Sequence, residues 1–152
     1  ANLHDLNLPE NFNLSNGAWG IGLNPRCAFS NAINGLVINA NYILQSNSKY
    51  GYKFGNPFQF QTLYYYETTI SEQFKIIPFA GYYFEHIGAD HHKNKRKVEG
   101  TGGQGHFIDV GMNLNYTNFL LSFSNAFALD QKYSGGTAKL GSKYSVQLTY
   151  LF

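Results

Sequence analysis

Five side chains near the middle of the chain have the types and the spacing to do chemistry. Glu85, His86, Asp90, His91 and His92 bring carboxylates and imidazoles together within eight residues. Such groups bind divalent transition metals such as copper and zinc, so His86, Asp90, His91 and His92 form a candidate metal site. Their spacing matches no closed structural zinc site, and the alternative interpretation is a solvated polar loop.

Enzyme chemistry has weaker candidates. A hydrolase would need a histidine, a carboxylate and a nucleophile or activated water on one surface. Glu85 and His86 are adjacent, and adjacent residues of a strand point to opposite faces. Cys27 stands in an alternation of apolar residues, which favours a packed thiol over a nucleophile. We therefore predict no enzyme activity and no cofactor.

The composition limits the environments in which the chain can fold. Aromatic residues make up 17% of its 152 residues and charged residues only 13%, about half of the ~25% usual in soluble domains. A soluble sandwich with a large core or a lipid bilayer would tolerate this balance. The formal charge of +2 is too small to indicate a nucleic-acid partner. No apolar run approaches the ~18 residues of a transmembrane helix.

Seven segments alternate apolar and polar residues with a period of two, which predicts strands with one apolar and one polar face. The last segment is the clearest, because Tyr144, Val146, Leu148 and Tyr150 alternate with polar residues. Pro78 cannot donate to a ladder and predicts a bulge or an irregular edge. The segments are 18–30, 35–46, 57–68, 74–87, 106–117, 119–129 and 144–152.

The polar faces of these segments consist mostly of Asn, Gln, Ser, Thr and Gly, without the many Lys and Glu that face bulk water. This indicates a confined wet interior, and the segments have the length that crosses a hydrocarbon layer. The prediction is an all-β fold, an antiparallel transmembrane β-barrel. Inward Tyr65 or Tyr83 could stack against a solute. The predicted lumen lining comprises Arg26, Asn39, Asn41, Gln59, Gln61, Glu67, Asp109, Asn113, Asn115 and Gln147.

Short and long connections alternate along the chain. Hairpin-sized turns are predicted at 31–34, 69–73 and 117–118, and long loops at 46–56, 88–104 and 130–142. Outer-membrane barrels have short periplasmic turns and long extracellular loops. We therefore expect one barrel domain, 1–152, in the outer membrane of a Gram-negative bacterium, with 1–17 as an extracellular loop. The cations of 93–97 would then meet the surrounding lipid and lipopolysaccharide.

The strand number raises a question of closure. Single-chain bacterial barrels have an even number of strands, and an open edge in lipid leaves backbone groups unsatisfied. Seven strands therefore predict the C-terminal part of a larger barrel, with the other strands missing, cleaved or carried by another outer-membrane subunit. The alternative is an eighth strand within 2–12, although Pro9 argues against it.

Six short motifs carry a family resemblance: Leu8 to Phe12, Asn16 to Trp19, Lys49 to Asn56, Pro78 to Glu85, Thr101 to Gly103 and Ser145 to Phe152. With them the chain resembles an uncharacterised group of transporter-like outer-membrane barrel proteins of Gram-negative bacteria, related to barrels of the phenol meta-pathway type. The resemblance covers most of the chain but only the C-terminal part of the family's barrel, and no motif is catalytic. It implies that Tyr150 and Phe152 belong to the signal that barrel-assembly machinery recognises.

Two functions agree with these expectations. The first is a channel or transporter-like barrel whose lumen passes or binds a small solute. The second is a structural or docking barrel, a subunit of an outer-membrane complex whose long loops hold a partner.

Overall fold

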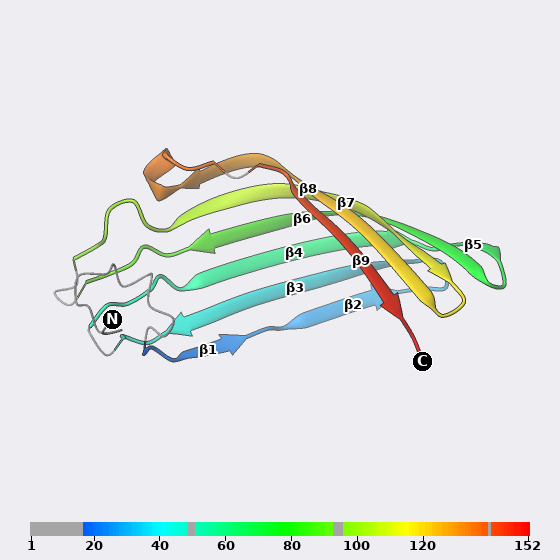
Figure 1. Cartoon of the computed structure of the whole chain (residues 1–152), viewed down its shortest axis with the longest axis horizontal. Coiled ribbons are helices and arrows are strands. Elements are labelled where there is room, and N and C mark those ends of the chain that lie inside the picture. The colour runs from blue at the N-terminus through cyan, green and yellow to red at the C-terminus, as the bar shows by residue number, and fades with distance from the viewer. Residues whose placement is uncertain (1–16, 49–50, 93–95, 140) are drawn as a thin grey trace, which may run out of the picture.

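The computed structural model describes residues 17–48, 51–92, 96–139 and 141–152, which form one antiparallel sheet (Figure 1). Within these ranges the chain has nine strands and one short 3-10 turn, Ser134–Gly136. None of the described residues belongs to a helix of the length and apolarity that crossing a membrane demands. The strands are β1 (Gly20–Leu23), β2 (Arg26–Ser30), β3 (Asn34–Gln45), β4 (Pro57–Tyr66), β5 (Thr68–Ser71), β6 (Phe74–Ile87), β7 (Gly103–Tyr116), β8 (Phe119–Tyr133) and β9 (Lys143–Tyr150).

These nine described strands occupy seven rows, one for each predicted segment. β1 and β2 both pair with β3, and the register continues across the break between them without a shift. Pro25 lies in that break and has no N–H to give to a ladder. β5 continues the row of β4 after Glu67 in the same way. The prediction of an all-β, antiparallel fold is confirmed.

The irregularity predicted at Pro78 lies on one side of β6 only. Pairing of β4 with β6 ends at Phe79, and pairing of β5 with β6 resumes at Ile76. On its other side Pro78 keeps a regular register opposite Met112 of β7. The strand itself therefore has no bulge there, and the gap between β4 and β5 accommodates the missing N–H.

The connections alternate in length as predicted, with changed boundaries. β5 shortens the turn predicted at 69–73 to Glu72 and Gln73. β8 runs on to Tyr133, so the loop predicted at 130–142 begins at Ser134, and the loop predicted at 88–104 ends before β7 at Gly103. Gly103 pairs with Tyr133, so the ladder continues beyond the apolar alternation. The predicted loop 1–17 and the alternative strand at 2–12 fall outside the described residues, apart from Gly17.

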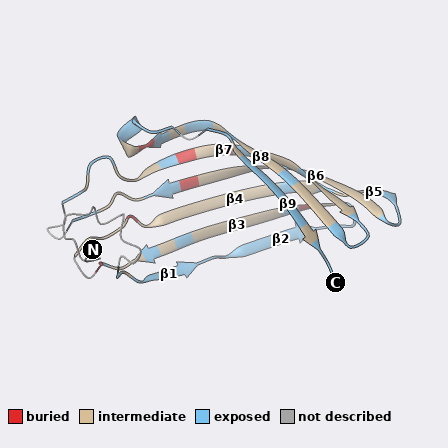
Figure 2. Cartoon of the chain, viewed as in Figure 1, coloured by how far each residue is buried: buried red, intermediate tan, exposed pale blue. Residues whose placement is uncertain are grey.

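One face of the sheet is apolar across all rows. The register sets Leu36 opposite Tyr64, Met112 opposite Phe123, and Phe123 opposite Val146. Most large side chains on this face are exposed, and the hydrophobic residues buried within the described part are Phe107 and Tyr133. Figure 2 accordingly shows strands that are mostly intermediate or exposed. The sheet buries little of its own apolar surface.

The sheet is curled and its two edges are open. Figure 1 shows β8 and β9 crossing in front of β3 and β4. In the described strands β9 pairs with β8 alone, while β1 and β2 pair with β3 alone. The described strands therefore form a curved wall that does not close into a barrel.

Candidate lumen site

The second face of the sheet collects the polar side chains predicted to line a lumen. Arg26 of β2 stands opposite Asn39 of β3, and Asn39 stands opposite Gln61 of β4. One step along the same strands, Asn41 stands opposite Gln59. Residues two apart share a face of a strand, so these side chains form two neighbouring polar rows.

Hydrogen bonds connect the amides across the strands. Asn41 Nδ2 donates to Gln59 Oε1 at 3.3 Å, and Asn39 Nδ2 donates to Gln61 Oε1 at 3.5 Å. Gln61 Nε2 in turn donates to Asp109 Oδ2 of β7 at 3.3 Å. This last bond passes over β6 where Gly81 pairs with Asp109. A Cβ at Gly81 would lie 2.2 Å from the Thr62 carbonyl oxygen, so the position accepts no side chain.

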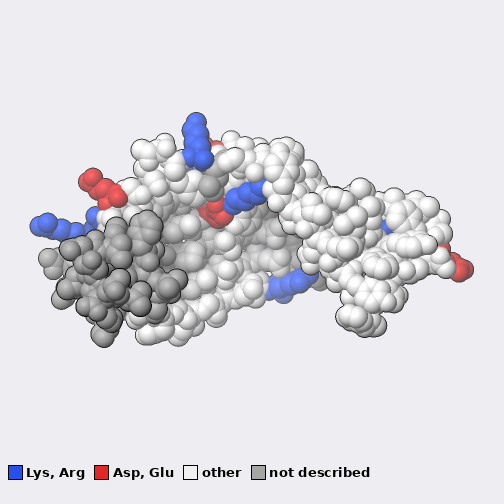
Figure 3. All heavy atoms as spheres, viewed as in Figure 1, with Lys and Arg blue, Asp and Glu red and all other residues white. Residues whose placement is uncertain are grey.

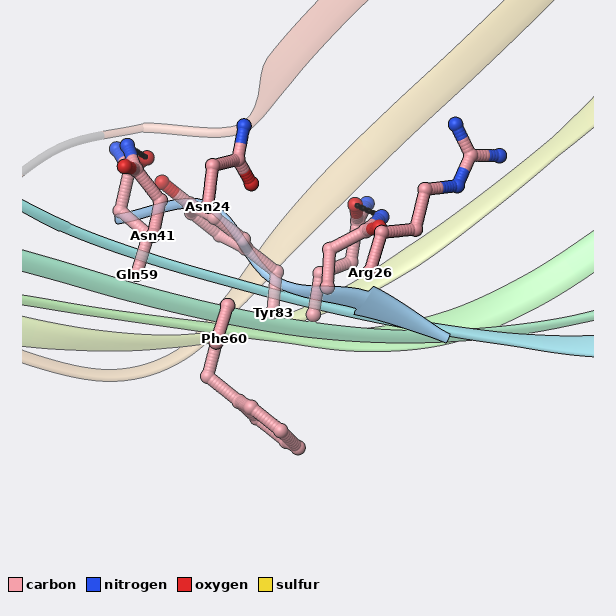
Figure 4. A pocket seen from close by; sticks show the side chains of 9 residues that line it. Asn24, Arg26, Asn41, Gln59, Phe60 and Tyr83 are labelled. Atoms are coloured by element: carbon pink, nitrogen blue, oxygen red, sulfur yellow. Dashed lines mark hydrogen bonds between the residues drawn. The ribbon is translucent and has the colours of Figure 1, made fainter. Parts of the chain in front are cut away.

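A hollow of about 420 Å3 opens over these rows. Figure 4 shows Asn24, Arg26, Asn41, Gln59 and Tyr83 on one side of the sheet, while the Phe60 ring points to the other side. The hollow is therefore polar, and its lining contains a single charged side chain. The lining residues are Asn24, Arg26, Asn39, Ala40, Asn41, Gln59, Phe60, Gln61 and Tyr83.

A buried cluster around Glu85 lies beside this hollow. Glu85 is 8% exposed, and it accepts hydrogen bonds from the hydroxyls of Tyr83 (2.7 Å) and Tyr133. Lys143 Nζ lies 3.1 Å from both carboxylate oxygens and 4.3 Å from the centroid of the Phe107 ring. Because Glu85 is on β6 and Lys143 on β9, the cluster joins strands that are not neighbours in the sheet. The polar face is therefore the concave one.

The other predicted lining residues share the polar face but lie outside the hollow. Glu67 forms an ion pair with Lys75 at 2.7 Å, and Asn115 pairs with Lys75 in the register. Asn115 Oδ1 is buried without a hydrogen-bond partner in the described residues. Asn113 stands opposite Ser122, and Ser122 opposite Gln147. The structure thus brings Arg26, Asn39, Asn41, Gln59 and Gln61 together as one site, with Asp109 at its margin.

The candidate metal residues are not gathered. In the described part of the chain no group of three or more His, Cys, Asp and Glu side chains could hold a metal ion. His86 shares the apolar face with Phe58, its partner in β4. Asp90 instead accepts hydrogen bonds from the Tyr52 hydroxyl (2.6 Å) and the Gly55 N–H (2.7 Å). Its carboxylate connects the loops 46–56 and 88–102, and the ring of His92 packs edge-on to that of Tyr52.

The residues of the predicted assembly signal lie at the end of β9. The Tyr150 ring contacts Phe119 and Phe152, each with centroids 5.0 Å apart. Phe152 is fully exposed beyond the last strand. Recognition of these residues by assembly machinery stays a prediction.

Comparison with known proteins adds no family: no family model, no curated protein and no solved structure matches the chain.

The alternation of apolar and polar residues indicates some of the site residues that were not predicted to line the lumen. Tyr83 and Glu85 follow Lys75 by eight and ten residues, so all three share the polar face of β6, and Tyr83 was predicted to point inward. Asn24 was implied by its position two residues before Arg26. Lys143 gave no such signal, because it stands before the clear alternation of the last segment and meets Glu85 only through the curl of the sheet.

Proposed function

We propose that this sheet belongs to a transmembrane β-barrel of the outer membrane of a Gram-negative bacterium, a channel or transporter-like protein whose lumen passes or binds a small polar solute. The observation that carries the proposal is the opposite character of the two faces. The concave face holds hydrogen-bonded amides, whereas the convex face presents exposed Trp19, Phe29 and Val146.

The exposed apolar face suits acyl chains better than water. Fully burying a large apolar side chain is worth about 1.5–3 kcal/mol, and this face leaves Trp19 at 65%, Phe29 at 63% and Val146 at 69% exposure. Figure 3 shows few charged side chains on the side that it presents. Charged groups avoid the hydrocarbon layer and gather beyond it. In the described strands, the charged side chains of the convex face are Asp130 and Lys132, near the loop end of β8, which supports the membrane assignment.

Closure of the barrel is part of the proposal. An open strand edge in lipid leaves N–H and C=O groups without partners, so the edges at β1–β2 and β9 require further strands. We infer that these come from more of the same polypeptide or from another subunit.

Electrical recording tests this function. The full-length native protein, extracted in detergent and reconstituted into a planar bilayer, is expected to give stepwise single-channel currents. A protein that stays in solution without detergent and passes no current would contradict both the membrane location and the channel.

The two open edges also favour a second candidate, a docking subunit of an outer-membrane complex. Affinity purification from native membranes separates the candidates. A stoichiometric partner together with an electrically silent barrel would favour docking, and currents without a partner would favour the channel.

A further inference from the structure

We propose that the hollow on the concave face binds a small hydroxylated carboxylate, with the Arg26 guanidinium taking the carboxylate and the surrounding amides taking the hydroxyl groups. This inference rests on the proposed function, because the hollow would lie in the lumen of the barrel. It goes further by naming the chemical class of the solute.

Among the described strand residues of the concave face, Arg26 is the one cation that lacks an anionic partner. Lys75 pairs with Glu67, and Lys143 pairs with Glu85. The Arg26 side chain has no hydrogen bond or ion pair within the described chain, and Figure 4 shows it extending over the concave face. A guanidinium offers a planar fork of N–H donors that matches a carboxylate in a bidentate way.

The rest of the lining suits hydroxyl groups. Each primary amide has two N–H donors and an oxygen with two lone pairs. The bonds from Asn41 to Gln59 and from Asn39 to Gln61 hold these amides in place and use only part of that capacity. Asn24 stands two residues before Arg26 and lines the same hollow. A chain of hydroxyl groups beside the carboxylate would find donors and acceptors on both sides.

Charge and shape argue against other solutes. Arg26 is the single charged residue of the lining, so the hollow itself is positive. Glu85 is neutralised by Lys143, and Asp109 lies beyond Gln61, outside the lining. Among the lining residues Tyr83 has the one aromatic ring on this side, since Phe60 points away (Figure 4). An aromatic hydrocarbon would therefore find almost no apolar wall.

Gluconate and sorbitol test the proposal, because both are open six-carbon chains with hydroxyl groups and only gluconate has a carboxylate. Isothermal titration calorimetry of the detergent-solubilised full-length protein is expected to show gluconate binding at least about tenfold tighter than sorbitol. Arg26→Gln removes this preference, and Arg26→Lys keeps part of it because lysine retains the charge without the fork. Arg96→Gln is the matched control, since Arg96 is the chain's other arginine and lies on an exposed loop.

Each result decides one proposal. Equal affinities for the two solutes, no gluconate binding to the folded protein, or an unchanged preference in Arg26→Gln would overturn the site. If Arg26→Gln does not fold, Arg26→Lys decides, and an unchanged affinity for gluconate overturns the site. Gluconate binding by a protein that passes no current would support the proposed binding site and overturn the proposed channel function. Single-channel currents from a protein that does not prefer gluconate would support the channel function and overturn the binding site.

Discussion

The Glu85 cluster is the most densely connected polar group of the described residues. The carboxylate receives two tyrosine hydroxyls and the Lys143 ammonium, and Phe107 packs beneath with no exposure. A buried charge is tolerated only when it is paired and hydrogen-bonded. Glu85 therefore fixes the position of β9 relative to β6, across two intervening strands.

Replacing Glu85 by glutamine removes the charge and keeps the shape. We expect Glu85→Gln to lower the free energy of unfolding by about 1–3 kcal/mol, because hydrogen bonds to a charged group are lost. The 40% exposure of the Lys143 side chain keeps the loss moderate, since water still solvates the ammonium. Urea unfolding of the lipid-folded protein measures the change. Glu72→Gln, in the exposed turn between β5 and β6, is the control, and equal midpoints for the two variants would refute the role of Glu85.

Glycine on the concave face lets aromatic rings lie flat on the wall. A Cβ at Gly35 would come within 2.5 Å of the Tyr65 ring. We expect Gly35→Ala to push the Tyr65 ring away from the sheet on the concave side. The free energy of unfolding should fall by about 1–3 kcal/mol, as it does on overpacking. The cost should largely disappear in a Tyr65→Ala background, which a double-mutant unfolding cycle measures. Gly141→Ala is the control, because no described atom lies within 4 Å of its added carbon. A cost that persists without the Tyr65 ring would contradict this explanation.

Sequence reasoning located the site residue by residue but not as a cluster. Alternation alone placed Arg26, Asn39, Asn41, Gln59 and Gln61 on one face, because side-chain direction in a strand depends only on parity. The pairing of Glu85 with Lys143 depends on how strongly the sheet curls. The residues of one strand can favour bending, but how far the sheet curls depends on the packing of several rows at once, and no single segment of the sequence determines it.

At the scale of elements, the long loops are organised by one acid. Asp90 accepts hydrogen bonds from Tyr52 and Gly55 of the loop 46–56, and its own N–H donates to Thr101 Oγ1 at 2.9 Å. Backbone bridges between Lys53 and His91 and between His91 and Lys97 accompany these bonds. The described parts of the two loops therefore continue the backbone pairing beyond the strands.

Removing this acid should loosen both loops together. We expect Asp90→Ala to raise the rate of trypsin cleavage after Lys53 and Lys97 several-fold in the folded protein, because cleavage follows the population of locally opened chain. Mass spectrometry of a limited digest identifies the sites. Asp130→Ala, at an exposed position of β8, is the control, and trypsin should cleave it at the same rate as the parent protein. Faster cleavage of one loop alone would argue against a shared anchor.

The sequence predicts a strand where apolar and polar residues alternate. It does not predict the parts of a strand that extend only because a neighbouring strand offers backbone partners. Tyr144 to Tyr150 alternates clearly and forms β9. Residues 130–133 look like a polar loop, yet they extend β8 because β7 offers partners as far as Gly103. The bulge between His106 and Phe107 has no sequence signal, since it reflects a mismatch between two strands. The breaks at Pro25 and Glu67 interrupt rows without changing their register.

At the scale of the whole molecule, the small inward residues of β8 explain the curl. Ser122, Ser124 and Ala126 face the concave side, whereas Phe123 and Phe127 face the convex side. Larger groups outside and smaller groups inside favour bending toward the polar face. The curl lets Lys143 reach Glu85 over Gly105, which has no side chain. Curvature of this kind suits a barrel wall better than a flat layer of a sandwich.

The orientation of the two faces yields the most direct prediction for the molecule. Val146 and Gln147 are successive residues of β9 on opposite faces, opposite Phe123 and Ser122 respectively. If the proposed barrel spans the membrane, we expect Val146→Lys to destabilise the lipid-folded protein by about 2–4 kcal/mol, as a cation near the middle of the hydrocarbon layer does. Gln147→Lys, the matched control, should cost less than about 1 kcal/mol because its ammonium would stay in a wet lumen. Urea titration of folding into lipid vesicles measures both values. If Gln147→Lys destabilised the protein more than Val146→Lys, Val146 would face water and Gln147 a dry core. The membrane-spanning barrel would then have to be abandoned.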